Sequence, residues 1–196
     1  MKKLCTVLLL ALIINQSFSQ EMKTLFKKDT VQANSYGGYG APMVGAAMLN
    51  NSWGVLVGGK GGLIRNHHFA FGGIGAAIIT STSIKDTVLN FSHNLAMGYG
   101  GIFLEYIFNF DSPIHISLPL NVAAGGILAG GKNDTFKIKS SGLFIVEPGI
   151  NLEFNFSKHF VPALNIGYRI VTANTTEASK AASGLNIALI LKIGKF

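Results

Sequence analysis

Apolar and polar residues alternate along most of this 196-residue chain. In one clear stretch, Ile114, Ile116 and Leu118 alternate with His115 and Ser117. Alternation with a period of two is typical of a β-strand that has one apolar face and one polar face. The pattern recurs between turn-forming residues and predicts eight strands, at residues 36–47, 53–64, 68–80, 92–108, 114–128, 143–156, 160–171 and 184–196.

The connections between the predicted strands alternate in length. Residues 65–67, 111–113 and 157–159 make short turns, whereas residues 81–90, 130–140 and 172–183 make longer loops. The tight connection at Asn50-Asn51 is the exception. Alternating strands joined by short turns at one end and longer loops at the other are the pattern of membrane barrels. We therefore predict an all-β protein, an eight-stranded antiparallel up-and-down transmembrane β-barrel over residues 35–196.

Three prolines fall inside the predicted strands, at Pro119, Pro148 and Pro162. A proline removes one hydrogen bond from a β-ladder, and a closed barrel has no free edge on which that loss is harmless. A β-bulge at each position would accommodate the missing donor. The exact registers around these prolines stay open at this point.

The N-terminus has the pattern of a cleaved signal peptide over residues 1–19. Lys2 and Lys3 precede an apolar run at residues 4–14, and Ser17 and Ser19 supply small residues before Gln20. This order is typical of secretory signals. An uncleaved anchor is the alternative, but the apolar run is shorter than a membrane-spanning helix requires. Residues 20–34 are polar and predict a periplasmic tail, so the sequence indicates a protein of a bacterial outer membrane.

The composition of the chain agrees with a barrel whose outer wall faces lipid. The chain has 24 glycines, only 13% charged residues and a mean hydropathy of +0.40. Its formal charge of +7 falls to +5 when Lys2 and Lys3 leave, and no basic run remains, so we expect no nucleic-acid partner. The one cysteine, Cys5, lies in the signal. A mature chain without it has no disulfide, thiol nucleophile or thiolate metal site.

Six charged residues fall on the polar faces of the predicted strands. A charge on the lipid face would cost about 2–4 kcal/mol near the membrane midplane, so these side chains are expected to point inward. An eight-stranded barrel has room inside for packed side chains but not for a wide pore. We predict an interior salt-bridge network; a proton or ion path and a buried catalytic carboxylate are the alternatives. Its members are Lys60, Glu105, Glu147, Glu153, Arg169 and Lys192.

The chain ends on an aromatic residue, Phe196. Its last strand resembles the closing strand of an outer-membrane barrel, where such chains carry the signal for the barrel assembly machinery. Phe196 is out of phase with the apolar face that runs from Leu185 to Ile193, and a bulge near Gly194 would restore the phase. An aromatic girdle is expected at the short-turn rim. Its predicted members are Phe108, Phe110, Phe154, Phe156, Phe160 and Phe196.

Other motifs give little indication of chemistry. His67, His68 and His159 lie in predicted turns, but no HxH or HExxH spacing supports a metal site. The glycines around Lys60 lack the spacing of a phosphate loop, and no helix follows them. A Ser/His/acid arrangement on the outer surface would make a lipid esterase, but no motif frames a serine. We expect no cofactor and no metal.

Glycine motifs give the chain a family resemblance. They lie at residues 37–42, 57–62 and 98–101, followed by residues 104–106 and 146–148. In this order, and with the terminal Phe196, they resemble small, largely uncharacterised outer-membrane β-barrel proteins of Bacteroidetes. The resemblance covers nearly the whole mature chain. It implies an eight-stranded barrel of the OmpA/OmpX-like kind and brings no catalytic residues.

These patterns together favour a non-enzymatic barrel with a closed, polar lumen. Its expected role is structural, or surface-binding through the three longer loops. Its expected partners are outer-membrane lipid, lipopolysaccharide and the barrel assembly machinery, and the sequence names no extracellular ligand. Two alternatives stay open: an outer-membrane lipid-modifying enzyme, and a soluble periplasmic lipocalin-like barrel that binds an apolar ligand.

Overall fold

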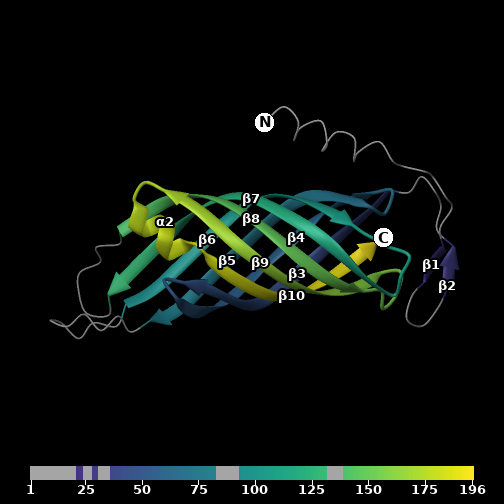
Figure 1. Ribbon diagram of the computed structural model, residues 1–196, viewed down its shortest axis with the longest axis horizontal. Coiled ribbons are helices and arrows are strands. Elements are labelled where there is room, and N and C mark those ends of the chain that lie inside the picture. The colour runs from purple at the N-terminus through teal and green to yellow at the C-terminus, as the bar shows by residue number, and fades with distance from the viewer. Residues whose placement is uncertain (1–20, 24–27, 31–35, 83–92, 132–138) are drawn as a thin grey trace, which may run out of the picture.

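Eight antiparallel strands close into one barrel in the computed structural model of the chain (Figure 1). The structure describes residues 21–23, 28–30, 36–82, 93–131 and 139–196. Each strand pairs with its neighbours in sequence, and the last strand pairs with the first, so the barrel has no edge. The strands are β3 (Tyr36–Leu49), β4 (Ser52–Arg65), β5 (Phe69–Thr82), β6 (His93–Ile107), β7 (Ile114–Gly131), β8 (Lys139–Phe154), β9 (Phe160–Ala173) and β10 (Gly184–Lys195).

The predicted fold is confirmed strand by strand. All eight predicted segments are strands, with ends that differ by a few residues. Short turns at residues 66–68, 108–113 and 155–159 lie at one end of the barrel, which we call the turn end. The opposite end, the loop end, carries the two-residue turn at Asn50-Asn51 and residues 174–183. The predicted loops at residues 81–90 and 130–140 fall largely outside the described residues, and the predicted signal peptide falls wholly outside them.

The predicted periplasmic tail contains two short strands that the sequence pattern did not indicate. β1 (Glu21–Lys23) and β2 (Lys28–Thr30) pair antiparallel with each other. They form a sheet separate from the barrel, and Figure 1 shows them outside its wall. The barrel itself begins at Tyr36.

The outer wall of the barrel carries apolar side chains, and the inner wall carries both polar and apolar ones. In β7, Ile114 and Ile116 are 52% and 47% exposed, whereas the intervening His115 is 6% exposed. The same alternation holds in the other strands, because successive side chains of a strand point to opposite faces. The predicted faces are therefore confirmed. Large apolar side chains of all eight strands lie on the exposed face, among them Val44, Trp53, Phe71, Ile102, Leu120, Ile150, Ile166 and Leu189.

The prolines interrupt the ladders without shifting them. The β7–β8 ladder has no pair next to Pro119, yet Ser117↔Asn151 before the gap and Leu120↔Pro148 after it share one register. The β8–β9 ladder likewise skips the position of Pro148 and resumes in register. The registers that the sequence left open are therefore regular here, without a bulge at Pro119 or Pro148. Each of these two gaps spans two ladder positions, whereas Pro162 pairs with Leu191 without a gap, and the side-chain alternation stays intact throughout.

Glycines on the inner wall let large side chains fit in the lumen. A Cβ atom on Gly62 would lie 2.1 Å from the carbonyl oxygen of Phe71, and one on Gly125 would lie 2.7 Å from Cβ of Tyr99. Real Cβ atoms do not approach other heavy atoms so closely. Glycine at these inward positions therefore permits the close approach of neighbouring strands and large side chains.

The predicted loop at residues 172–183 contains a short helix, α2 (Thr176–Ala182). Thr175 caps its N-terminus, and its hydroxyl accepts a hydrogen bond of 3.2 Å from the backbone N–H of Ala178. Glu177 in the first turn and Lys180 in the last turn complement the helix dipole. Figure 1 shows α2 folded over the loop end of the barrel. No helix in the described part of the chain is long and apolar enough to cross a membrane.

Candidate functional site in the barrel lumen

Glu105 is the centre of a buried charge network near the turn end of the lumen. It lies on the inward face of β6 and is 2% exposed. The Nζ atom of Lys192 lies 2.6 Å from Oε1 of Glu105, and the Nζ atom of Lys60 lies 2.8 Å from Oε2. A buried carboxylate without such partners would lose its hydration without compensation, so the two lysines allow it to remain inside the barrel.

Three neutral side chains also donate hydrogen bonds to Glu105. The hydroxyl of Tyr39 donates to Oε2 at 3.0 Å. The hydroxyl of Ser117 and the side-chain amide of Asn151 donate to Oε1 at 2.5 Å and 2.8 Å. With the two lysines, these donors come from β3, β4, β7, β8 and β10. One carboxylate therefore joins five other strands of the barrel wall and has no free acceptor site for a further ligand.

A second carboxylate, Glu153, extends the network toward the turn end. Lys192 Nζ lies 2.6 Å from its Oε1 atom, and the hydroxyl of Ser117, which has one proton for the two carboxylates, also contacts this oxygen. On the other side, Nε2 of His115 lies 3.3 Å from Oε2 of Glu153. Lys192 therefore bridges Glu105 and Glu153, and their two negative charges face the two positive charges of Lys60 and Lys192.

The structure places all six predicted network residues in the lumen, between 0% and 6% exposed. Ion pairs connect four of them, namely Lys60, Glu105, Glu153 and Lys192. The other two, Glu147 and Arg169, have different partners. Glu147 accepts hydrogen bonds from Asn121 at 2.9 Å and Tyr99 at 3.4 Å, and no ion pair reaches it among the described residues. Alternation in a strand decides the face on which a residue lies, but it does not decide the partners.

Arg169 binds backbone rather than a carboxylate. Its Nε atom donates to the carbonyl oxygen of Ala182 at 2.8 Å, and Nη2 donates to that of Met48 at 2.7 Å. Ala182 is the last residue of α2, whose final carbonyl groups lack partners within the helix. Arg169 therefore fastens the helix to the loop end of the barrel and carries a charge that complements the helix C-terminus.

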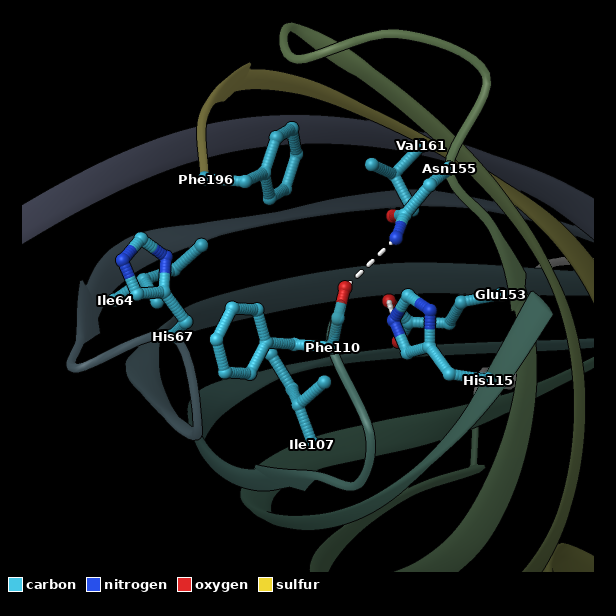
Figure 2. A pocket seen from close by; sticks show the side chains of 9 residues that line it. All are labelled: Ile64, His67, Ile107, Phe110, His115, Glu153, Asn155, Val161 and Phe196. Carbon is cyan, nitrogen blue, oxygen red and sulfur yellow. Dashed lines mark hydrogen bonds and ion pairs between the residues drawn. The ribbon is translucent and has the colours of Figure 1, made fainter. Parts of the chain in front are cut away.

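Closely packed side chains fill the turn end of the lumen. A cavity of about 20 Å³ lies below Glu153, and Figure 2 shows the side chains around it. The amide of Asn155 donates to the carbonyl oxygen of Phe110 at 2.8 Å. The ring of His67 stacks on that of Phe110, with centroids 4.8 Å apart. The cavity is lined by Ile64, His67, Ile107, Phe110, His115, Glu153, Asn155, Val161 and Phe196.

Phe196 turns into the lumen, as its phase in the sequence indicates, and no bulge near Gly194 returns it to the lipid face. The β10–β3 ladder runs in one register from Ile193↔Gly40 to Lys195↔Gly38. Phe196 therefore shares the inward face of Lys192, and its ring stacks on Tyr39 with centroids 5.8 Å apart. Phe110 also points inward and is 6% exposed. The predicted aromatic girdle is thus right for Phe108 and Phe156, which are exposed, and wrong for these two rings.

The charged side chains of this network are buried in the lumen, and their ion pairs are with one another. Apolar side chains pack between the network and the loop end, and include Leu56, Ile78, Met97, Ile127, Ile145 and Val171. No group of three or more His, Cys, Asp or Glu side chains in the described part of the chain is placed to hold a metal ion. The buried ion pairs of the lumen connect strands on different sides of the barrel wall.

Sequence reasoning assigned the inward face correctly but did not assign Tyr39, Ser117, Asn151 or His115 to the network. The signal for three of them was available. Ser117 and His115 alternate with the outward isoleucines of β7, and Asn151 alternates with the outward apolar residues of β8. Tyr39 lies in a glycine-rich strand, β3, where small residues on both faces obscure the alternation.

Removal of Phe196 is expected to reduce barrel assembly and to leave export intact. The ring stacks on Tyr39 and packs against the buried Phe110, so its loss exposes the turn end of the lumen. The measurement is the fraction of heat-modifiable protein in the outer membrane, with periplasmic protein counted in parallel. Lys195→Ala is the matched control, because Lys195 is exposed on the neighbouring position. Normal assembly without Phe196 would contradict the prediction that this residue is part of the assembly signal.

Comparison with solved structures finds the same fold. The crystal structure of Neisserial surface protein A matches with a TM-score of 0.60 and 11% identity, over 84% of this chain and 100% of that one. Ail, the attachment invasion locus protein of Yersinia pestis, in complex with the heparin analogue sucrose octasulfate, matches with a TM-score of 0.48, at 12% identity over 82% and 97% of the two chains.

A major outer membrane protein from Thermus thermophilus matches with a TM-score of 0.48 and 9% identity, over 81% of this chain and 98% of that one. No protein-family model matches the sequence. No curated protein matches it significantly. At 11% identity, the likeness to Neisserial surface protein A supports the barrel fold alone and carries no location, ligand or activity across.

Proposed function

We propose that this chain is a non-enzymatic barrel of a bacterial outer membrane, with a structural or surface-binding role through the connections at its loop end. One observation carries the proposal. The barrel has an apolar exterior around a lumen whose charges are buried and paired. Soluble proteins rarely expose continuous apolar surface on this scale, whereas a barrel in lipid requires it.

The packing of the lumen argues against a soluble carrier of apolar ligands. Such a carrier needs an apolar internal cavity, and ligand sites usually have volumes of about 300–1,000 Å³. Here Phe103, Tyr39 and the charge network occupy the interior, and the cavity beside Glu153 measures about 20 Å³. Glu105 and Glu153 are buried on the inner wall, so neither is placed to serve as the acid of a lipid esterase on the outer surface.

The finer assignments belong to the same proposal. The predicted signal peptide supports export, and an inward-turned Phe196 in a strand that closes the barrel is compatible with recognition by the barrel assembly machinery. The turn end then faces the periplasm and the loop end faces outward. Lipopolysaccharide surrounds the outer half of the wall. The resemblance of the glycine motifs to barrels of Bacteroidetes stays a prediction.

Fractionation tests the proposal directly. The full chain is expressed in a Gram-negative host, and the outer-membrane fraction is run on SDS gels with and without boiling. A folded membrane barrel is expected to migrate faster before boiling than after it. Lipid A of the host is compared by mass spectrometry with and without the protein. Recovery of folded protein in the soluble periplasmic extract overturns the membrane location, and altered lipid A overturns the non-enzymatic role.

A further inference from the structure

Glu147 is a buried carboxylate that lies outside the charge network around Glu105. It is on the inward face of β8 and is 5% exposed. Its oxygens accept hydrogen bonds from Asn121 and Tyr99, and in the described part of the chain it forms no ion pair. Two neutral donors do not offset the hydration that a buried charge loses, so a compensating cation is expected nearby.

The buried charges of the described residues balance only if Arg169 compensates Glu147. The buried lysines and arginines are Lys60, Arg169 and Lys192, and the buried carboxylates are Glu105, Glu147 and Glu153. Two cations and two carboxylates of this set belong to the network. Arg169 and Glu147 are the cation and the carboxylate that remain.

Arg169 lies opposite Glu147 in the barrel wall. The β8–β9 ladder pairs Val146 with Ile170 and resumes in the same register after Pro148, so Glu147 and Arg169 occupy facing inward positions. Directly opposed residues of antiparallel strands have Cβ atoms about 4.5–5.5 Å apart. Two nitrogens of the guanidinium bind the backbone at the loop end, whereas Nη1 has no hydrogen-bond partner among the described residues. Nη1 is therefore available to the carboxylate.

Two buried asparagines near this pair also have polar atoms without partners. Both amide atoms of Asn186 and the Oδ1 atom of Asn121 lack a hydrogen-bond partner within the described ranges, although the side chains are 1% and 8% exposed. Asn121 is the cross-strand partner of Glu147, and Asn186 is the cross-strand partner of Gly167, two residues before Arg169. These atoms include donors and acceptors. Water supplies both functions, whereas an ion of either sign would satisfy only one of them.

We propose that Glu147 and Arg169 form a water-bridged ion pair on the loop-end side of the Glu105 network. The water accepts a hydrogen bond from Nη1 of Arg169, donates to Glu147 and completes the hydrogen bonds of the two asparagines. A buried water typically makes about three such bonds. The bridge compensates the cation that fastens α2 to the loop end. The inference goes beyond the proposed function, because it concerns the interior of the barrel and not what the loop end binds.

Coupling between the two charges is measured with a double-mutant cycle of Glu147→Gln and Arg169→Gln, by urea unfolding of the protein in detergent micelles. The loss in the double variant is expected to be smaller than the combined single losses by about tenfold in the unfolding equilibrium constant, because no charge is left unpaired. The matched control is the cycle of Glu153→Gln with Arg169→Gln. Glu153 lies further along β8 and pairs with Lys192, so this cycle is expected to be additive within about twofold.

Water at the site is detected by NMR, from cross-relaxation between water and the side-chain amide protons of Asn186 in the wild-type protein. The cross peak is expected to persist in Tyr99→Phe, which removes an exchangeable hydroxyl group from this part of the lumen. Asn151 is the matched control, because its buried amide already donates to Glu105 and Ser117. No cross peak with water is expected at Asn151.

An additive cycle for Glu147 and Arg169 overturns the ion pair. Coupling without a water cross peak at Asn186 means that the two charges meet directly, and it overturns the water bridge. A cross peak of equal strength at Asn151, or its loss from Asn186 in Tyr99→Phe, also overturns the bridge, because the signal then does not report water at the unpartnered atoms. Absence of the cross peak in wild-type protein overturns the inference even where a variant does not fold.

Discussion

Glu105→Gln is expected to lower the free energy of unfolding by about 3–5 kcal/mol, as is typical when one partner of a buried ion pair is removed. Glutamine keeps the shape of the side chain, but Lys60 and Lys192 then lose the carboxylate that lies 2.8 Å and 2.6 Å away. Lys192 retains Glu153, whereas Lys60 retains no carboxylate partner in the described part of the chain. The measurement is urea unfolding of the barrel in lipid vesicles.

Two variants make this result specific. Glu177→Gln removes an exposed carboxylate from α2 and is expected to change the free energy of unfolding by less than about 0.5 kcal/mol. Combining Glu105→Gln with Lys60→Met removes the stranded cation and is expected to recover part of the loss, because neighbouring members of one network are not additive. A loss below about 1 kcal/mol for Glu105→Gln would show that the network does not stabilise the barrel.

Ile166→Arg is expected to cost about 2–4 kcal/mol of the free energy of unfolding in lipid vesicles, because it places a charge on the lipid-facing wall. Ile166 is 50% exposed and lies near the middle of β9. The same exposure in a soluble barrel would make the substitution nearly neutral. The size of the effect therefore distinguishes a wall in lipid from a wall in water.

Asn174→Arg is the matched control for that measurement. Asn174 is exposed and follows the last residue of β9, Ala173, at the loop end. An arginine there is close to the membrane surface and is expected to cost at most about 1 kcal/mol. Equal effects of the two substitutions would contradict a lipid-facing wall at Ile166.

Much of this fold follows from one property of the sequence. In β7, the alternation of Ile114, Ile116 and Leu118 with His115 and Ser117 predicts both the strand and its inward face. The inward positions of Glu105 and Lys192 follow in the same way. Their pairing does not, because the distance between two lumen side chains depends on the tilt and stagger of strands that are far apart in sequence.

Three local features were left open or missed at the level of the sequence. A bulge was one way to accommodate each proline, but the strands around Pro119 and Pro148 keep their register across the gap. The sequence places Phe196 out of phase with the lipid face, and the alternation of β10 continues to the chain end without the bulge that would have restored the phase. The helix α2 was missed, although Thr175, Glu177 and Lys180 lie at the positions of a cap and of charges that favour a helix.

The convergence of distant strands on Glu105 has a consequence for the order of folding. Tyr39 comes from the first strand of the barrel and Lys192 from the last, so the complete set of donors exists only after β10 has paired with β3. Before that step, an open sheet carries an incompletely compensated carboxylate, which is costly in lipid. The network is therefore complete only in the closed barrel, and its ion pairs favour ring closure over partly assembled sheets.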